Sequence, residues 1–116
     1  MFKMNHFVEL YLNEFPEEQD RVDKHIKLNG TFLGHIFFDE SICGPLCHMI
    51  KHSTDPDRIR RLVAFIEKML LEGDAYVKSV VTINILNKIK LEKGIFEKAK
   101  PYLSEELIIK FQEEAM

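Results

Sequence analysis

The stretch from Ala75 to about Glu92 constrains the fold more than any other part of the chain. Placed on a helix at about 100° per residue, its apolar residues occupy every side. They are Tyr76, Val77, Val80, Val81, Ile83, Ile85, Leu86 and Ile89. A helix that is apolar on all sides lies in the middle of a bundle. We therefore predict a central buried helix at about residues 75–90.

The same stretch also contains the pattern of a β-strand. Val81, Ile83 and Ile85 alternate with polar residues, and β-branched side chains favour strands. We favour the helix because no second stretch of comparable quality could pair with this one. A buried Asn84 then needs a partner, since an unpaired buried polar group costs about 1–3 kcal/mol. The segment 32–38 is our candidate for that partner.

Helical spacing and capping residues divide the rest of the chain. They predict helices over Met4–Phe15 and Glu17–Leu28, from Gly44-Pro45 onward, from Asp55-Pro56 to Gly73, over Ile95–Lys100, and from Ser104 onward. The segment from Thr31 to Phe38 is short and interrupted by Gly34, which favours a buried extended segment or a loop. Helices joined by short connections predict an all-α, single-domain antiparallel bundle, or a short array of helical hairpins, over residues 1–116.

Composition excludes several classes of function. The net charge of −3 argues against a dedicated nucleic-acid binder. No apolar run approaches the ~18–20 residues of a membrane span, and Lys3, His6 and Glu9 interrupt the N-terminal apolar stretch, which is unlike a signal peptide. The two cysteines, Cys43 and Cys47, are close in sequence and predict reduced thiols and a cytoplasmic location.

Reactive side chains are most concentrated between residues 35 and 52. They are His35, Asp39, Glu40, Cys43, Cys47, His48 and His52. Their spacing does not match a recognised zinc pattern, and no catalytic motif accompanies them, so we assign no catalytic residue, no metal ligand and no cofactor. The alternative is a small metal-dependent or thiol enzyme that uses His35, Cys43, Cys47 and His48, with Cys43 just before a helix N-terminus.

Charge is arranged in blocks along the chain. Residues 1–20 have a balance of −4 and residues 101–116 a balance of −3. Because the ends of a domain often lie close together, the two blocks predict an acidic face that could bind a basic protein. The candidate partner-binding residues are Glu14, Glu17, Glu18, Glu105 and Glu106. A candidate anion-binding group is Arg58, Arg60 and Arg61, in the first turns of a helix.

Four stretches together resemble a family of small uncharacterised bacterial domains of the immunity-protein type. They are Phe15-Pro16-Glu17, the run from Leu33 to Phe38, the run from Arg58 to Leu70, and the run from Asp74 to Val81. The resemblance implies an all-helical domain that neutralises a bacterial toxin, and it brings no catalytic residues. We therefore expect a non-enzymatic protein-binding module with a protein partner, and neither a nucleic-acid nor a membrane partner.

Overall fold

The computed structural model describes residues 1–92 and 94–114, and helices make up almost all of this part of the chain. The α-helices are α1 (Met4–Glu14), α2 (Gln19–Asn29), α3 (Gly34–Phe38), α4 (Gly44–His52), α5 (Pro56–Glu72), α6 (Ala75–Val80), α7 (Asn87–Leu91), α8 (Ile95–Ala99) and α9 (Glu105–Glu114). Short 3₁₀ turns occur at Pro16–Glu18 and Lys100–Tyr102, and π-helical segments at Asp39–Cys43 and Val81–Leu86. The predicted all-α fold is confirmed.

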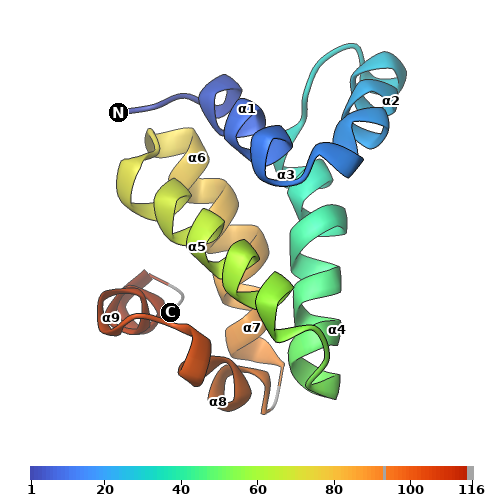
Figure 1. Ribbon diagram of the computed structural model, residues 1–116. Helices are drawn as coiled ribbons and strands as arrows, with labels where there is room; N and C mark the ends of the chain where they lie inside the picture. The colour runs from blue at the N-terminus through green and yellow to red at the C-terminus, as the bar shows by residue number, and fades with distance from the viewer. Residues whose placement is uncertain (93, 115–116) are drawn as a thin grey trace.

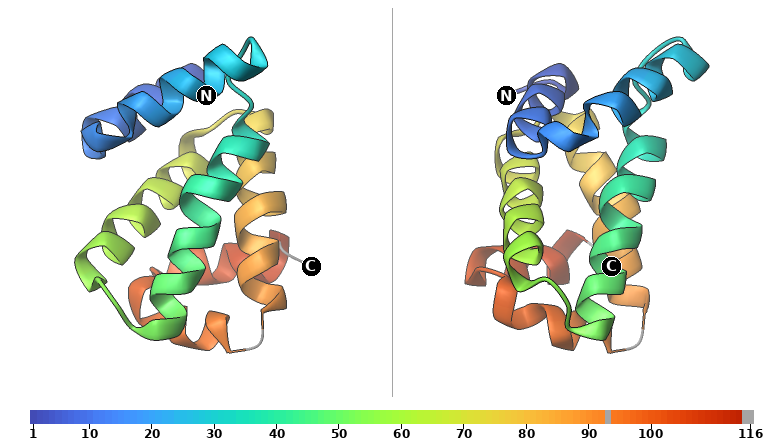
Figure 2. Two further views of the ribbon diagram at one scale, coloured as in Figure 1. Left: turned by 90° about the vertical axis from the view of Figure 1, so that its right-hand side faces the viewer. Right: turned by 45° about the vertical axis from the view of Figure 1, so that its right-hand side comes forward.

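Three long helical rods form the centre of the molecule (Figures 1 and 2). The first rod is α3, a π-helical segment and α4; the second is α5; the third is α6, a π-helical segment and α7. Helices α1 and α2 cross one end of these rods, and α8 and α9 cross the other end (Figure 2). No helix in the described part of the chain is long and apolar enough to cross a membrane.

The third rod contains the predicted central helix. Its inner residues Val77, Val81 and Ile85 have no exposed surface, and the strand alternative is wrong. The expectation that every side would be buried is also wrong, because 58% of the Ile83 surface is exposed. The rod packs against the π-helical segment of the first rod, against α5 and against α9, and its remaining side faces solvent.

Asn84 has the partner predicted for it. Its Nδ2 donates a hydrogen bond of 3.0 Å to the backbone oxygen of His35, and its Oδ1 contacts the His35 Nδ1. The hydroxyl of Tyr76 accepts a bond of 3.2 Å from the backbone N–H of Gly34. These contacts fix the start of the first rod on the third.

The first rod departs from the predicted structure at two places. The segment Gly34–Phe38 is helical rather than extended, and the helix continues through Gly44 and Pro45 instead of beginning there. The N–H of Gly44 bonds the carbonyl of Asp39, five residues earlier, which marks a π-helical turn. A proline ring clashes with the carbonyl four residues earlier in an α-helix. The wider π-helical turn relieves that clash, so the rod accommodates the proline.

The predicted helix starts at Asp55, Asp74 and Ser104 are confirmed. The side chains of these residues accept hydrogen bonds from the backbone N–H groups three residues later, at 3.3, 3.0 and 3.1 Å. Gly73 ends α5 in an extended conformation rather than a left-handed one. A Cβ there would lie 2.4 Å from the side chain of Val77 and 2.5 Å from the Met69 carbonyl, so the tight turn into α6 requires glycine.

Candidate functional site

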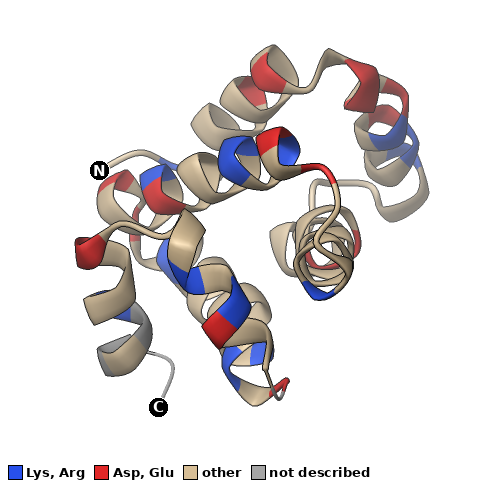
Figure 3. Cartoon of the chain, turned by 60° about the horizontal axis from the view of Figure 1, so that its bottom comes forward, with Lys and Arg blue, Asp and Glu red and all other residues tan. Residues whose placement is uncertain are grey.

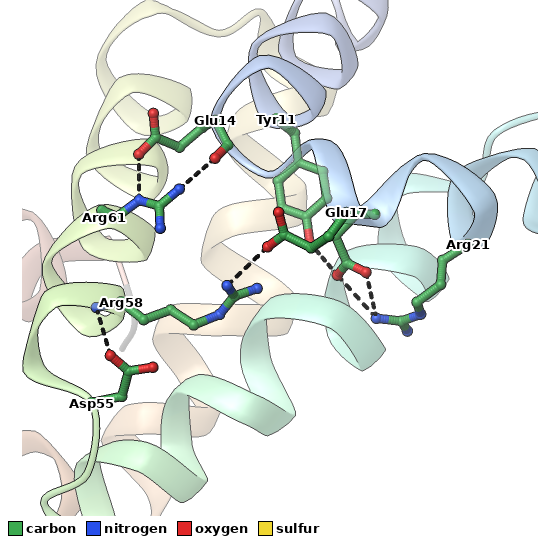
Figure 4. Close-up of polar contacts among 8 residues, drawn as sticks. Tyr11, Glu14, Glu17, Arg21, Asp55, Arg58 and Arg61 are labelled. Carbon is green, nitrogen blue, oxygen red and sulfur yellow. Dashed lines mark hydrogen bonds and ion pairs between the residues drawn. The ribbon is translucent and has the colours of Figure 1, made fainter.

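Two of the predicted acidic residues pair with two of the predicted basic residues (Figure 4). The carboxylate of Glu14 lies 2.6 Å from Arg61 Nε, and Arg61 Nη2 also donates to the Glu14 backbone oxygen. The carboxylate of Glu17 lies 3.0 Å from Arg58 Nη1. These four residues of the acidic and basic candidate sites therefore form one polar network, which joins α1 and the turn after it to the start of α5.

Phe15 lies under this network. The guanidinium carbons of Arg58 and Arg61 lie 4.8 and 4.7 Å from the centre of its ring, and the phenylalanine has no exposed surface. Guanidinium groups over an aromatic face are attracted by its electron density. The arginines thus cover an apolar residue and orient towards the two glutamates at the same time.

Glu18 differs from its neighbours because it points into the protein. It accepts a hydrogen bond of 2.8 Å from the Tyr11 hydroxyl and one of 3.0 Å from Arg21, and only 7% of the residue is exposed. Burial, together with the hydrogen bond to Glu18, raises the pKa of Tyr11 well above its usual value. The Tyr11 hydroxyl and the Glu18 carboxylate thus stabilise the turn between α1 and α2. Glu18 is buried and is not the surface carboxylate that the sequence suggested.

We expect the carboxylate of Glu17 to titrate below the usual range for glutamate. Its own backbone N–H and the Arg58 guanidinium both lower its pKa. Because the pKa is lower in the folded than in the unfolded state, this stabilisation is present above the unfolded pKa and is lost as the pH falls through the folded pKa. An NMR titration of Glu17 measures this pKa. Arg58→Ala should raise the pKa of Glu17 part of the way to the usual value for glutamate, because the hydrogen bond from the backbone N–H remains. An unchanged pKa would contradict the role of Arg58.

A groove of about 430 Å³ lies beside the network, between α1 and α5. Leu10, Asn13, Ala64 and Phe65 line it together with the charged residues Glu14, Arg60, Arg61 and Lys68. Three cations against one carboxylate make its edge basic. Arg60 is also within 3.4 Å of Asp57, whereas Lys68 forms no ion pair within the part of the chain that the structure describes.

Lys68 is the functional candidate that the sequence analysis missed. Arg60, Ala64 and Lys68 are spaced four residues apart, so they lie on one stripe of α5. The small side chain of Ala64 between two long cations leaves the hollow open. The spacing of these three residues can be read from the sequence. Without the position of α1 beside α5, however, they look like the ordinary solvent-exposed side of a helix.

Glu105 and Glu106 do not join the other acidic candidates. They are exposed in the first turn of α9. Figures 1 and 3 show α1 and α9 on opposite sides of α5. The two acidic ends of the chain therefore form separate surfaces rather than the single face expected from the sequence.

The residues of the enzyme alternative are not brought together. His35 is bonded to Asn84, and the ring of His48 lies against that of His52. In the described residues, no group of three or more His, Cys, Asp or Glu side chains could hold a metal ion.

Cys43 and Cys47 are free, buried thiols four residues apart on the continuous first rod. Cys43 therefore lies inside a helix and not ahead of a helix N-terminus, as the sequence suggested. Its hydrogen bond with Cys47 and its burial raise the pKa of the Cys43 thiol. A nucleophilic cysteine needs the opposite shift, so this raised pKa does not favour Cys43 as a nucleophile; the same hydrogen bond lowers the pKa of the Cys47 thiol.

Comparison with known proteins finds a matching family of domains. A family described as a domain of unknown function, DUF7674, matches residues 8–115. No curated protein and no solved structure matches the chain. The match covers most of α1 and all of α5, and so it includes every residue that lines the groove and every residue of the polar network.

Proposed function

Since the chain belongs to the DUF7674 family of domains of unknown function, we propose from its geometry that it is a non-enzymatic module that binds another protein through the groove between α1 and α5. The observation that carries this proposal is the combination of an open groove, apolar residues inside it and charged residues along its edge. Protein interfaces combine an apolar centre with a polar rim in the same way.

The charges of the groove define the segment that fits it. Arg60 and Lys68 are eight residues apart, which corresponds to about 12 Å along a helix. A partner segment with an apolar side chain opposite Ala64 and carboxylates on either side would complement this stripe. Glu105 and Glu106 form a second, acidic surface on the other side of α5, which suits a basic region of the same partner.

The more specific proposal is an immunity protein that blocks a bacterial toxin by covering its active site. The resemblance described above supports this role. The buried free thiols also agree with the cytoplasmic location that such a protein would need. Co-expression with the toxin domain encoded by a neighbouring gene tests it: growth should be restored only when this chain is present. If no neighbouring gene encodes a toxin, the specific proposal is wrong while protein binding remains testable.

The groove itself is tested by filling it. Ala64→Arg places a long side chain in the hollow without entering the core, since Ala64 is exposed. A pull-down followed by mass spectrometry would first identify the partner. We expect Ala64→Arg to weaken its binding at least about tenfold, or ~1.4 kcal/mol, in calorimetric titrations. Ala75→Arg, which adds the same group at an exposed site outside the groove, should leave the affinity unchanged.

A second variant separates the two surfaces. Glu105→Lys/Glu106→Lys should weaken binding only if α9 also contacts the partner. Equal affinities for the wild type, the Ala64 variant and the α9 variant would show that the partner binds elsewhere on the molecule.

A further inference from the structure

Two imidazoles lie side by side on the surface at the end of α4. His48 and His52 are one helical turn apart, and their ring centres are 4.5 Å from each other with an angle of 51° between the planes. Both residues are exposed. Neither forms a hydrogen bond with any residue that the structure describes. The ring nitrogens are therefore open to a ligand from solvent.

A pair of imidazoles on one helical stripe suits a divalent transition-metal ion. Helical histidines four residues apart can bind one zinc ion together, and zinc–imidazole bonds measure about 2.0–2.1 Å. The two nitrogens on one ion must then lie within about 4.2 Å of each other. With ring centres only 4.5 Å apart, rotation of the two side chains can bring one nitrogen of each ring to this separation while the backbone stays in place.

We propose that His48 and His52 form a surface site for one divalent transition-metal ion such as Ni²⁺ or Zn²⁺. Water completes the coordination, because no third protein ligand stands near the pair among the described residues. The site differs in kind from an enzyme centre built on His35, Cys43, Cys47 and His48, because it includes neither cysteine. Met49 also occupies the position where zinc peptidases of the H-E-x-x-H pattern have their glutamate. The site binds the ion and supplies no general base.

The helix terminus itself favours a cation at this end of α4, whereas the lysines beside it do not. The last carbonyl groups of an α-helix carry partial negative charge, and His52 is the final residue of α4. One lysine already uses this end, since Lys98 Nζ donates a bond of 3.1 Å to the backbone oxygen of Lys51. That ammonium group binds a backbone carbonyl oxygen rather than either imidazole, so both rings remain accessible to an ion from solvent.

The test uses the full chain without an affinity tag and Ni²⁺ as the probe. We expect calorimetric titration to show one ion per chain. His48→Asn and His52→Asn should each weaken binding by about a hundredfold, because the second nitrogen of a pair binds at a high effective concentration. His6→Asn is the matched control: it removes one histidine from the chain and should leave the affinity unchanged.

A thermal measurement checks that the folded helix makes the site. Because the two rings are held together only when α4 is folded, Ni²⁺ should raise the Tm of the wild type and of the His6 variant. The Tm of the His48 and His52 variants should not rise. Equal affinities in all four proteins, or the same Tm shift in all of them, would overturn the proposal.

Discussion

Replacing Ile85 with alanine is expected to lower the free energy of unfolding by about 3 kcal/mol, as large-to-small substitutions in tightly packed cores do. Ile85 has no exposed surface. It faces Leu46 and Leu107 across a small apolar cavity, so the shortened side chain would enlarge a space that nothing else can fill. Urea unfolding followed by circular dichroism measures the loss.

Ile83 provides the matched control for this substitution. It is the same residue type on the same rod, but 58% of its surface is exposed. Ile83→Ala should therefore change stability by no more than about 0.5 kcal/mol. Similar losses for both variants would contradict the orientation of this rod, with one side inward and the other in solvent.

Replacing Glu18 with alanine should cost about 2 kcal/mol, because it leaves the buried Tyr11 hydroxyl without an acceptor. Arg21 also loses its carboxylate partner. Glu17→Ala is the control: it removes the neighbouring carboxylate, which is exposed, and should have little effect on unfolding. Both are measured by urea denaturation at neutral pH.

A double variant shows whether the lost acceptor is the cause. Tyr11→Phe/Glu18→Ala removes the hydroxyl together with the carboxylate, so no buried donor remains unpaired. It should be more stable than Glu18→Ala alone. If the double variant is less stable by the full cost of both single changes, Glu18 acts through something other than the hydrogen bond with Tyr11.

The sequence predicts the helices well where local chemistry determines them. Asp55, Asp74 and Ser104 cap helices because their side chains can reach backbone N–H groups three residues later, which is a property of a few adjacent residues. The prediction for the first rod is wrong because Pro45 is as compatible with a helix start as with a π-helical turn. Packing against the third rod decides between the two, and that packing cannot be read from adjacent residues.

The candidate site is harder to predict than the fold. Glu14 and Arg61 are 47 positions apart, so the sequence identifies each as a charged candidate but does not reveal the ion pair between them. Glu18 resembles its exposed neighbour Glu17 in the sequence, since two adjacent glutamates differ only in which side of the turn they occupy. Ion pairs between distant residues use part of the predicted acidic surface and part of the predicted basic surface. The groove beside them depends on how α1 lies against α5.

The two π-helical segments, Asp39–Cys43 and Val81–Leu86, pack against each other. A π-helical turn closes its hydrogen bond one residue later than an α-helical turn, so each segment contains one inserted residue. The two wide turns lie against each other, and the α-helical parts on either side of both still bury apolar residues. A change of chain length in one segment alone would rotate half of that rod by about 100° and turn its buried residues outward. We therefore expect an insertion or deletion in one of these segments to require a matching change in the other, although they lie about forty residues apart in the chain.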